Sequence, residues 1–289
     1  MNTGKLLLLV AMLSGFSVDT NAQGILKKLK KKAQDIVTKD NGTMPESNPG
    51  GEGSLGPDAV DCIGAPNPAR DVKTDLKKEF YTNDIVVEML NEENKKTISY
   101  FDVDALAMKS IQPGVSDKAS YIDSEGFFYA YNKHNGYYEK SGMLSMGSMS
   151  LMGPSMMVAH YKLPNDPFWN KFEYLSNQKV KTFPFMYLEF TFLYKPEHFM
   201  GEGYTKVPSG QPGYTRFDHT MEGYKGSYVI FDDKDRLIEI NIKADTDQFK
   251  GEGYFKYSYE QATVCLPEAK EVKMPGQGIF EKALDPNNN

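Results

Sequence analysis

The residues whose type and spacing are most unusual lie between positions 143 and 160. Methionine recurs there at every third position and then twice more before a histidine, in the series Met143, Met146, Met149, Met152, Met156, Met157 and His160. Thioether sulfur is a soft ligand suited to Cu(I), so the sequence offers a candidate copper site formed by Met146, Met149, Met152 and His160. Methionine is also flexible and polarizable, so the six methionines are equally candidates for an adaptable lid over an apolar ligand. An ordinary loop that covers the core is the third interpretation.

The rest of the chain shows no catalytic pattern. The four histidines of the whole chain form no paired metal motif, and no nucleophile elbow, phosphate loop or dinucleotide fingerprint occurs. Glu197, His198 and Glu202 are the nearest approach to an acid–base or metal cluster. The acidic run 232–235 resembles the start of a calcium loop but lacks its glycine and distal glutamate, which favours a hairpin turn. The sequence therefore predicts a protein that is not an enzyme and, apart from the copper alternative, has no cofactor.

Residues 1–22 have the three parts of a signal peptide. Lys5 supplies the positive charge, residues 6–18 supply the apolar region, and Thr20 and Ala22 are the small residues before a cleavage site. The apolar region is shorter than the roughly 20 residues that a membrane-spanning helix needs. We expect cleavage after Ala22 and a mature protein in the periplasm or on the cell surface of a Gram-negative bacterium.

The segment 23–37 is predicted to form a basic amphipathic helix. Its apolar residues fall within one sector of about 120° and its lysines occupy the rest. The apolar side includes Ile25, Leu26, Leu29 and Ile36, and the basic side includes Lys27, Lys28 and Lys31. Such a helix suits an anionic membrane surface, and equally a partner protein or the chain's own body. Peripheral membrane contact through residues 23–37 is therefore one of three alternatives.

Composition divides the remaining chain into a linker, a body and a tail. Residues 38–70 are rich in glycine and proline and read as a flexible linker. Residues 71–275 form the body, and residues 276–289 form a C-terminal tail. The two cysteines, Cys62 and Cys265, are an even count in an oxidising compartment, which favours a disulfide. Two unrelated free thiols are the alternative.

Short aromatic runs separated by Asn, Asp and Gly turns make the body predominantly β. Strands are expected at 85–90, 97–102, 119–122, 127–131, 137–140, 183–194, 227–231, 237–242, 254–259 and 263–266. In the run 237–242, alternation places Ile238, Ile240 and Ile242 on one apolar face. Helices are expected at 71–81 and at 166–176, the second with Asp166 as its N-cap and Pro167 as its first residue. The predicted fold class is mainly β (α+β), a curved antiparallel sheet in an open or incomplete barrel with a few helices.

Charge limits the classes of partner. The net charge is −6, and lysines are concentrated before residue 40, so the body is more acidic than the total indicates. An acidic body repels nucleic acid, and no basic–aromatic binding pattern occurs. The expected partner is therefore an apolar ligand or an envelope protein.

Two aromatic runs in the body resemble a known family. Residues 121–129, Tyr-Ile-Asp-Ser-Glu-Gly-Phe-Phe-Tyr, and residues 255–267, ending in Val-Cys-Leu-Pro, are similar to strands of exported proteins grouped as domain of unknown function 4412. That group looks related to the lipoprotein-carrier (LolA- and LolB-like) superfamily. The resemblance implies a curved antiparallel sheet around helices, with an apolar interior that holds acyl chains. The 18 Tyr and 17 Phe residues suit the lining of such an interior, or the filling of a core.

The leading hypothesis from sequence is a non-enzymatic periplasmic binding protein for a lipid, a lipoprotein or an apolar segment of an envelope partner. A methionine-rich Cu(I)-binding envelope protein is the second hypothesis. A structural or adhesion platform is the third.

Overall fold

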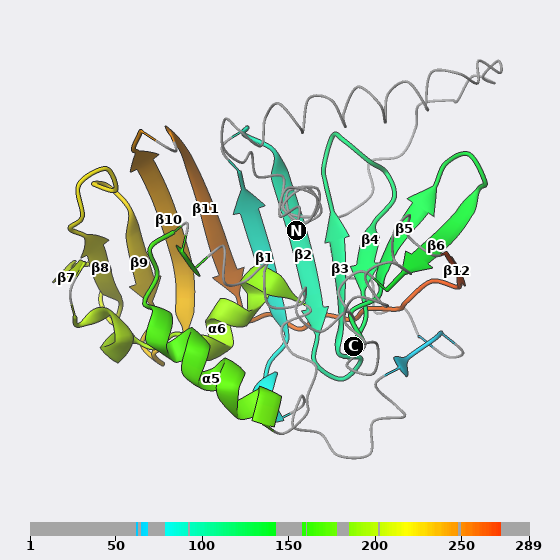
Figure 1. Cartoon of the computed structure of the whole chain (residues 1–289), viewed down its shortest axis with the longest axis horizontal. Helices are drawn as coiled ribbons and strands as arrows, with labels where there is room; N and C mark the ends of the chain where they lie inside the picture. Colours follow the sequence, from blue (N-terminus) through cyan, green and yellow to red (C-terminus); the bar gives the residue numbers. More distant parts are fainter. Residues whose placement is uncertain are drawn as a thin grey trace, which may run out of the picture. The chain divides into compact units, whose positions relative to one another are not determined.

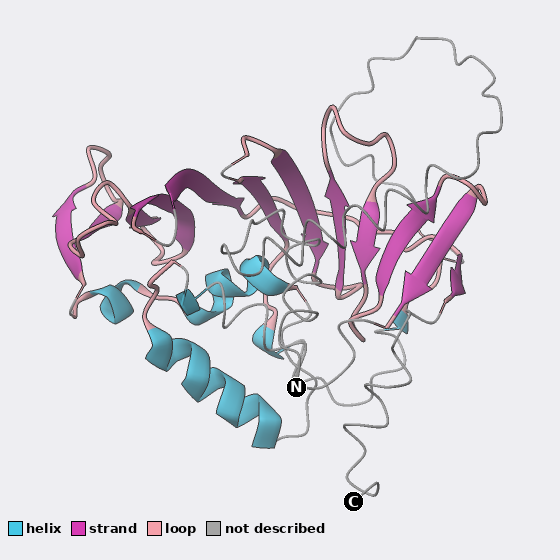
Figure 2. Cartoon of the chain, turned by 45° about the horizontal axis from the view of Figure 1, so that its top comes forward, coloured by secondary structure: helices cyan, strands magenta, loops and turns pink. Residues whose placement is uncertain are grey.

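In the computed structural model, the part of the chain before residue 59 and the part after it form two units, and only residues of the second are described. The described residues are 62, 65–68, 79–91, 93–142, 158–159, 161–177, 185–201, 203–247 and 250–272. These residues form one 12-stranded sheet with helices on one side of it (Figures 1 and 2). The prediction of a mainly β fold built on an open antiparallel sheet is confirmed.

The strands form two meanders that meet in the middle of the sheet. From edge to edge the order is β12-β6-β5-β4-β3-β2-β1-β11-β10-β9-β8-β7. Strands that lie side by side in the sheet are therefore consecutive in the chain, except in the β1–β11 and β12–β6 pairs. All pairs are antiparallel except the last. The bounds are β1 Ile85–Leu90, β2 Lys96–Asp102, β3 Ala107–Ile111, β4 Ser120–Ile122, β5 Phe128–Asn132, β6 Tyr137–Ser141, β7 Tyr204–Pro208, β8 Thr215–His219, β9 Tyr228–Phe231, β10 Leu237–Asp245, β11 Lys250–Ser258 and β12 Ala269–Glu271.

The helical elements follow one another between the two meanders. They are α5 Asn165–Asn177, the 3-10 helix η2 Met186–Glu189, α6 Phe190–Leu193 and the 3-10 helix η3 Pro196–Phe199. The helix predicted at 166–176 is confirmed as α5, although it begins at Asn165, so Asp166 lies in its first turn. The strand predicted at 183–194 is wrong, because the described part of that run is helical and buried. Of the helix predicted at 71–81, residues 71–78 lie outside the described residues.

One face of the sheet, called here the inner face, carries the apolar residues. Cross-strand partners share a face, and one row across five strands is buried throughout, from Met89 through Phe255, Ile240 and Val229 to Phe217. The opposite, outer face of the same strands carries ion pairs such as Lys243–Glu252. Such exposed pairs contribute little stability, so burial on the inner face is what holds the sheet.

A bulge in β10 changes the predicted alternation. The register between β10 and β9 shifts between Leu237 and Glu239, and an inserted residue reverses which side chains face inward. Leu237, Ile240 and Ile242 are therefore buried, while Ile238 is only half-buried. The prediction that Ile238 shares the apolar face with Ile240 and Ile242 is wrong for this reason.

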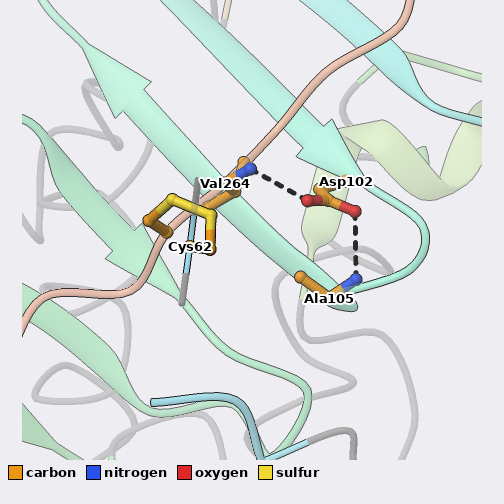
Figure 3. The surroundings of a disulfide bond; sticks show 5 residues. Cys62, Asp102, Ala105 and Val264 are labelled. Atoms are coloured by element: carbon orange, nitrogen blue, oxygen red, sulfur yellow. Dashed lines mark hydrogen bonds between the residues drawn. A yellow bond between two sulfur atoms is a disulfide. The ribbon is translucent and has the colours of Figure 1, made fainter. Parts of the chain in front are cut away.

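The predicted disulfide between Cys62 and Cys265 is confirmed, with the two Cα atoms 5.4 Å apart. Cys265 belongs to an extended segment whose neighbours Val264 and Leu266 are buried in a small cluster with Ala105, Ala107 and Tyr129. The carboxylate of Asp102 holds this segment. It accepts the N–H groups of Val264 at 2.9 Å and of Ala105 at 3.0 Å (Figure 3). The strand predicted at 263–266 is thus an extended segment held by the Asp102 carboxylate and by the disulfide, and pairing with β6 begins only at Ala269.

Candidate functional site

Most residues that the sequence singled out lie outside the described residues. The methionine series Met143, Met146, Met149, Met152, Met156 and Met157, the neighbouring His160, and the helix residues Ile25, Leu26, Lys27, Lys28, Leu29, Lys31 and Ile36 are in this group. Cys62 and Cys265 are brought together as predicted. The lid, copper and membrane-helix hypotheses therefore stay predictions.

The other polar motifs have local structural roles. His198 Nδ1 accepts the backbone N–H of Lys195 at 3.1 Å at the start of η3, and Glu202 lies outside the described residues. Asp232 accepts the N–H groups of Lys234 and Arg236, each at 2.9 Å, and so closes the β9–β10 turn, as the hairpin interpretation predicted. In the described part of the chain, no group of three or more His, Cys, Asp or Glu residues could hold a metal ion.

The inner face is covered by residues 185–194, which comprise η2 and α6 and are called here the cover segment. Tyr187 anchors it to β2 through a hydrogen bond of 2.7 Å between its hydroxyl and that of Ser99. Tyr257 on β11 donates from its hydroxyl to the carbonyl of Tyr187 at 3.0 Å. Phe190 is fully buried and packs near Phe255 of β11. Aromatic side chains on both sides thus form one interior between the sheet and the cover segment.

Among the described residues, one carboxyl group lies in this interior. Glu189, the last residue of η2, is 0% exposed. Its Oε1 accepts the hydroxyl of Tyr81 at 2.7 Å and the backbone N–H of Phe185 at 3.2 Å. Its Oε2 has no hydrogen-bond partner among the described residues. An unpartnered buried polar atom costs about 1–3 kcal/mol, so this position needs an explanation.

Aromatic rings surround the Tyr81–Glu189 pair. The Tyr81 ring lies between 4.8 and 5.4 Å, centroid to centroid, from four phenylalanine rings, which are those of Phe80, Phe101, Phe185 and Phe192. These rings come from the segment before β1, from β2 and from the cover segment. The pair therefore lies where three separate parts of the chain converge, and its surroundings are apolar.

Burial decides the protonation of Glu189. Removal from water disfavours the charged carboxylate, and it raises the pKa of Glu189 well above the ordinary value of 4.5, despite the opposing hydrogen bonds from Tyr81 and Phe185. The pKa of Tyr81 is also raised, first by burial and then by Glu189. Because Oε1 already accepts two hydrogen bonds, the carboxyl proton belongs on Oε2, which makes that atom a donor. The site can therefore offer one hydrogen bond to an acceptor in an apolar setting.

Sequence reasoning missed Glu189. It is the one charged residue between Phe183 and Tyr194, in an otherwise apolar and aromatic run apart from Thr191. A charged residue in such a run is rarely fully buried without a partner. The charged residue in the aromatic run was therefore a visible signal. Because the run was predicted to be a strand, Glu189 was not recognised as a buried residue. Tyr81, which is 108 positions away in the chain, carries no signal that relates it to Glu189.

The comparisons with known proteins do not assign the chain to a family. No family model matches it, and no curated protein matches it. The chain aligns with the crystal structure of an uncharacterized conserved protein from Thermus thermophilus at 9% identity, over 68% of this chain and 94% of that chain, with a TM-score of 0.32. Within the described residues, no helix has both the length and the apolar character needed to cross a membrane.

Proposed function

We propose that the protein is a non-enzymatic binding protein for an apolar ligand that carries one hydrogen-bond acceptor, such as a lipid, the acyl part of a lipoprotein, or an apolar segment of an envelope partner. The observation that carries the proposal is the unpartnered Oε2 of Glu189 in an aromatic interior. A neutral carboxyl group in apolar surroundings is a hydrogen-bond donor suited to an ester or amide carbonyl oxygen. A ligand that accepts this hydrogen bond would offset the free-energy cost of burying the Glu189 donor without a partner.

The ligand would lie between the inner face and the cover segment. In the structure the cover segment itself occupies this face, with Tyr187 and Phe190 against β2 and β11, so binding requires the segment to move outward. The exchange replaces ring-to-ring contacts with ring-to-ligand contacts. Apolar burial contributes about 25 cal/mol per Å² in either case, so the hydrogen bond to Glu189 is the term that favours a ligand with an acceptor.

The proposed place of action is the periplasm or the cell surface. The Cys62–Cys265 disulfide is of the kind that persists in oxidising compartments, which supports the export expected from residues 1–22. The basic helix expected at 23–37 would supply contact with a membrane or an envelope partner.

The test starts from protein purified from its native envelope, whose bound compounds are extracted and identified by mass spectrometry. A fluorescent fatty acid methyl ester, which has one carbonyl acceptor, is then titrated into the mature protein. Glu189→Leu removes the donor and keeps the site apolar, so we expect its affinity for the ester to fall about tenfold, the equivalent of about 1.4 kcal/mol. Glu252→Leu makes the same change at an exposed position and is expected to bind like the wild type. Protein that is consistently empty and does not bind the ester would refute the proposal.

A further inference from the structure

Side-chain hydrogen bonds fasten the cover segment to the elements around it. Tyr187 is bonded through its hydroxyl to that of Ser99 on β2 at 2.7 Å, and through its carbonyl to the hydroxyl of Tyr257 on β11 at 3.0 Å. Glu189 accepts the hydroxyl of Tyr81, from the segment before β1, at 2.7 Å. Burial raises the pKa of each of the three tyrosines above the ordinary value of 10, so their hydroxyls stay neutral. Among these groups, the Glu189 carboxyl is the one whose charge changes as the pH passes through the neutral range.

No cation among the described residues faces this carboxyl. The groups that face it are the hydroxyl of Tyr81 and the backbone N–H of Phe185. Lys171 of the neighbouring helix α5 has its Nζ over the ring of Phe80, 4.8 Å from the centroid. The ion pairs of the described residues do not include Glu189. A carboxylate at this position would therefore be a buried charge without a counterion.

The other charged groups on the elements packed around Glu189 are engaged elsewhere or exposed. Those at the β1–β2 end accept backbone N–H groups, those on β2 and β11 lie on the outer face, and the acidic groups of the segment before β1 and of α5 are exposed. They are Asp84 with Val103, Asp102 with Ala105 and Val264, Lys96 with Glu88, Glu252 with Lys243, Lys250 with Asp245, Lys256 over Tyr254, and the exposed Glu79 and Asp166.

The cost of an uncompensated charge applies only while the cover segment is closed. Removal from water raises the pKa of the buried Glu189 carboxyl well above 4.5, whereas a carboxyl that has moved outward into water keeps its ordinary pKa. The closed position is therefore fully favoured below pH 4.5 and loses its advantage as pH rises towards the raised pKa. Between the two pKa values, the ratio of open to closed protein rises by up to about tenfold per pH unit.

We propose that the cover segment is a proton-dependent lid, which closes on the inner face when Glu189 is protonated and opens when Glu189 loses its proton. Opening uncovers the aromatic face on which Phe190 packs near Phe255, where the apolar ligand is proposed to bind. The inference rests on the proposed function for that consequence alone, because the movement itself needs no ligand. Higher pH would then admit the ligand faster, through a larger open fraction.

Amide hydrogen exchange of the ligand-free mature protein between pH 5 and pH 7.5 measures the opening. The amides of Leu188 and Tyr194, which donate to the carbonyls of Phe185 and Phe190, report on the cover segment, and the amides of β1 and β11 report on the sheet. We expect the cover amides to be less protected than the sheet amides at every pH. Their protection factors, which are corrected for the intrinsic exchange rate, should fall by up to about tenfold per pH unit.

Two variants assign the pH dependence to one carboxyl. Glu189→Gln keeps the Oε1 acceptor and cannot ionise, so the protection factors of its cover amides should not change with pH. Glu189→Leu, which cannot ionise either, takes its place if the glutamine variant does not fold. Glu252→Gln makes the same change on a side chain that is 66% exposed and should keep the wild-type slope. The proposal is overturned if cover and sheet amides are equally protected, if wild-type protection of the cover amides does not change with pH, or if the Glu189 variant keeps the wild-type slope.

Stopped-flow association of the fluorescent methyl ester separates this inference from the proposed function. If the ester binds, its association rate should rise with pH in step with the opening of the cover segment in the wild type, and stay constant in the Glu189→Gln variant. Protein that opens with rising pH but never binds the ester supports the lid and refutes the apolar-ligand proposal. Protein that binds the ester but whose cover amides show no pH-dependent protection supports the binding proposal and overturns the lid.

Discussion

Glu189 and His219 are both buried on the inner side of the sheet, and burial shifts their pKa values in opposite directions. The pKa of the Glu189 carboxyl is raised and that of the His219 imidazole is lowered, because low polarity favours the uncharged form of each group. Each group uses one of its two polar atoms within the fold and leaves the other without a partner among the described residues. Burial thus favours, in both groups, the uncharged form that can donate a hydrogen bond.

The raised pKa of Glu189 predicts that stability falls as pH rises. Between pH 4.5 and the folded-state pKa, the folded protein keeps a proton that the unfolded chain has lost, so this contribution to the free energy of unfolding is complete below pH 4.5 and declines by up to about 1.4 kcal/mol per pH unit above it. Glu189→Gln keeps Oε1 as the acceptor for Tyr81 and Phe185 and removes the titration. We expect the variant to gain roughly 1–3 kcal/mol relative to the wild type between pH 5 and pH 8.

Urea unfolding at several pH values measures this difference. The pKa of Asp123 is also raised, mainly by burial, so a residual slope is expected in both proteins and only the difference between them reports on Glu189. Curves for Glu189→Gln and wild type that stay parallel from pH 5 to pH 8 would show that Glu189 is ionised in the folded protein.

At the scale of elements, the cover segment shows how packing overrides local preference. Aromatic residues favour strands, and residues 183–194 contain six of them, yet η2 and α6 are helical. A helical turn lets Phe190, Leu193 and Tyr194 all reach the interior, whereas a strand would direct alternate side chains outward. The covered inner face, rather than the segment's own propensity, selects the helix.

Phe190→Ala tests how much the cover segment contributes to stability. Phe190 is fully buried, and removing a buried phenylalanine ring costs about 3–5 kcal/mol through lost burial and an unfilled cavity. Phe127→Ala removes the same ring from a partly exposed position in the β4–β5 turn and should cost less than half as much. Chemical denaturation of both variants measures the losses. Equal losses would mean that the cover segment is not a tightly packed part of the fold.

At the scale of the whole molecule, the sheet depends on pairing between distant parts of the chain. β1 and β11 join the two meanders, with Val87 opposite Tyr257 and Met89 opposite Phe255. The Cys62–Cys265 bond spans 203 positions in the sequence and connects a residue that precedes β1 in the chain to a residue that follows β11. It therefore restrains, in the unfolded chain, the ends that β1–β11 pairing must bring together.

Replacing both cysteines by serine is expected to lower the free energy of unfolding by about 2–5 kcal/mol, because a loop of this length has a large closure entropy. Urea unfolding of the oxidised wild type and of Cys62→Ser/Cys265→Ser measures the loss. Wild type treated with a reductant is the control and should match the double variant. A loss below about 1 kcal/mol would show that the unfolded chain is not much restrained by the bond.

Local patterns predicted much of the sheet. β1 has the predicted bounds, and β2, β4, β5, β6 and β9 are within one residue of them, whereas β11 begins at Lys250, before the predicted start at residue 254. These strands were predictable because aromatic and β-branched residues between turn residues are a local signal. The strands β3, β7, β8 and β12 were not predicted. Their sequences, such as Ala-Met-Lys-Ser-Ile in β3 and Tyr-Thr-Lys-Val-Pro in β7, have few apolar positions, and pairing with neighbouring strands supplies the rest of their stability.

The sequence by itself determined the fold class, most strand positions, α5 and the plausibility of the disulfide, because each depends on residue type and short-range spacing. The tertiary structure alone decided the β1–β11 junction, the bulge that turns Ile238 away from the inner face, the helical cover segment, the meeting of Tyr81 with Glu189, and the packing of His219 against Tyr204 and Tyr224. These features come from contacts between residues far apart in the chain, and from the burial that the contacts create. Burial is also what makes a single carboxyl and a single imidazole chemically distinctive here, so neither could be recognised as a site before the sheet and its cover were in place.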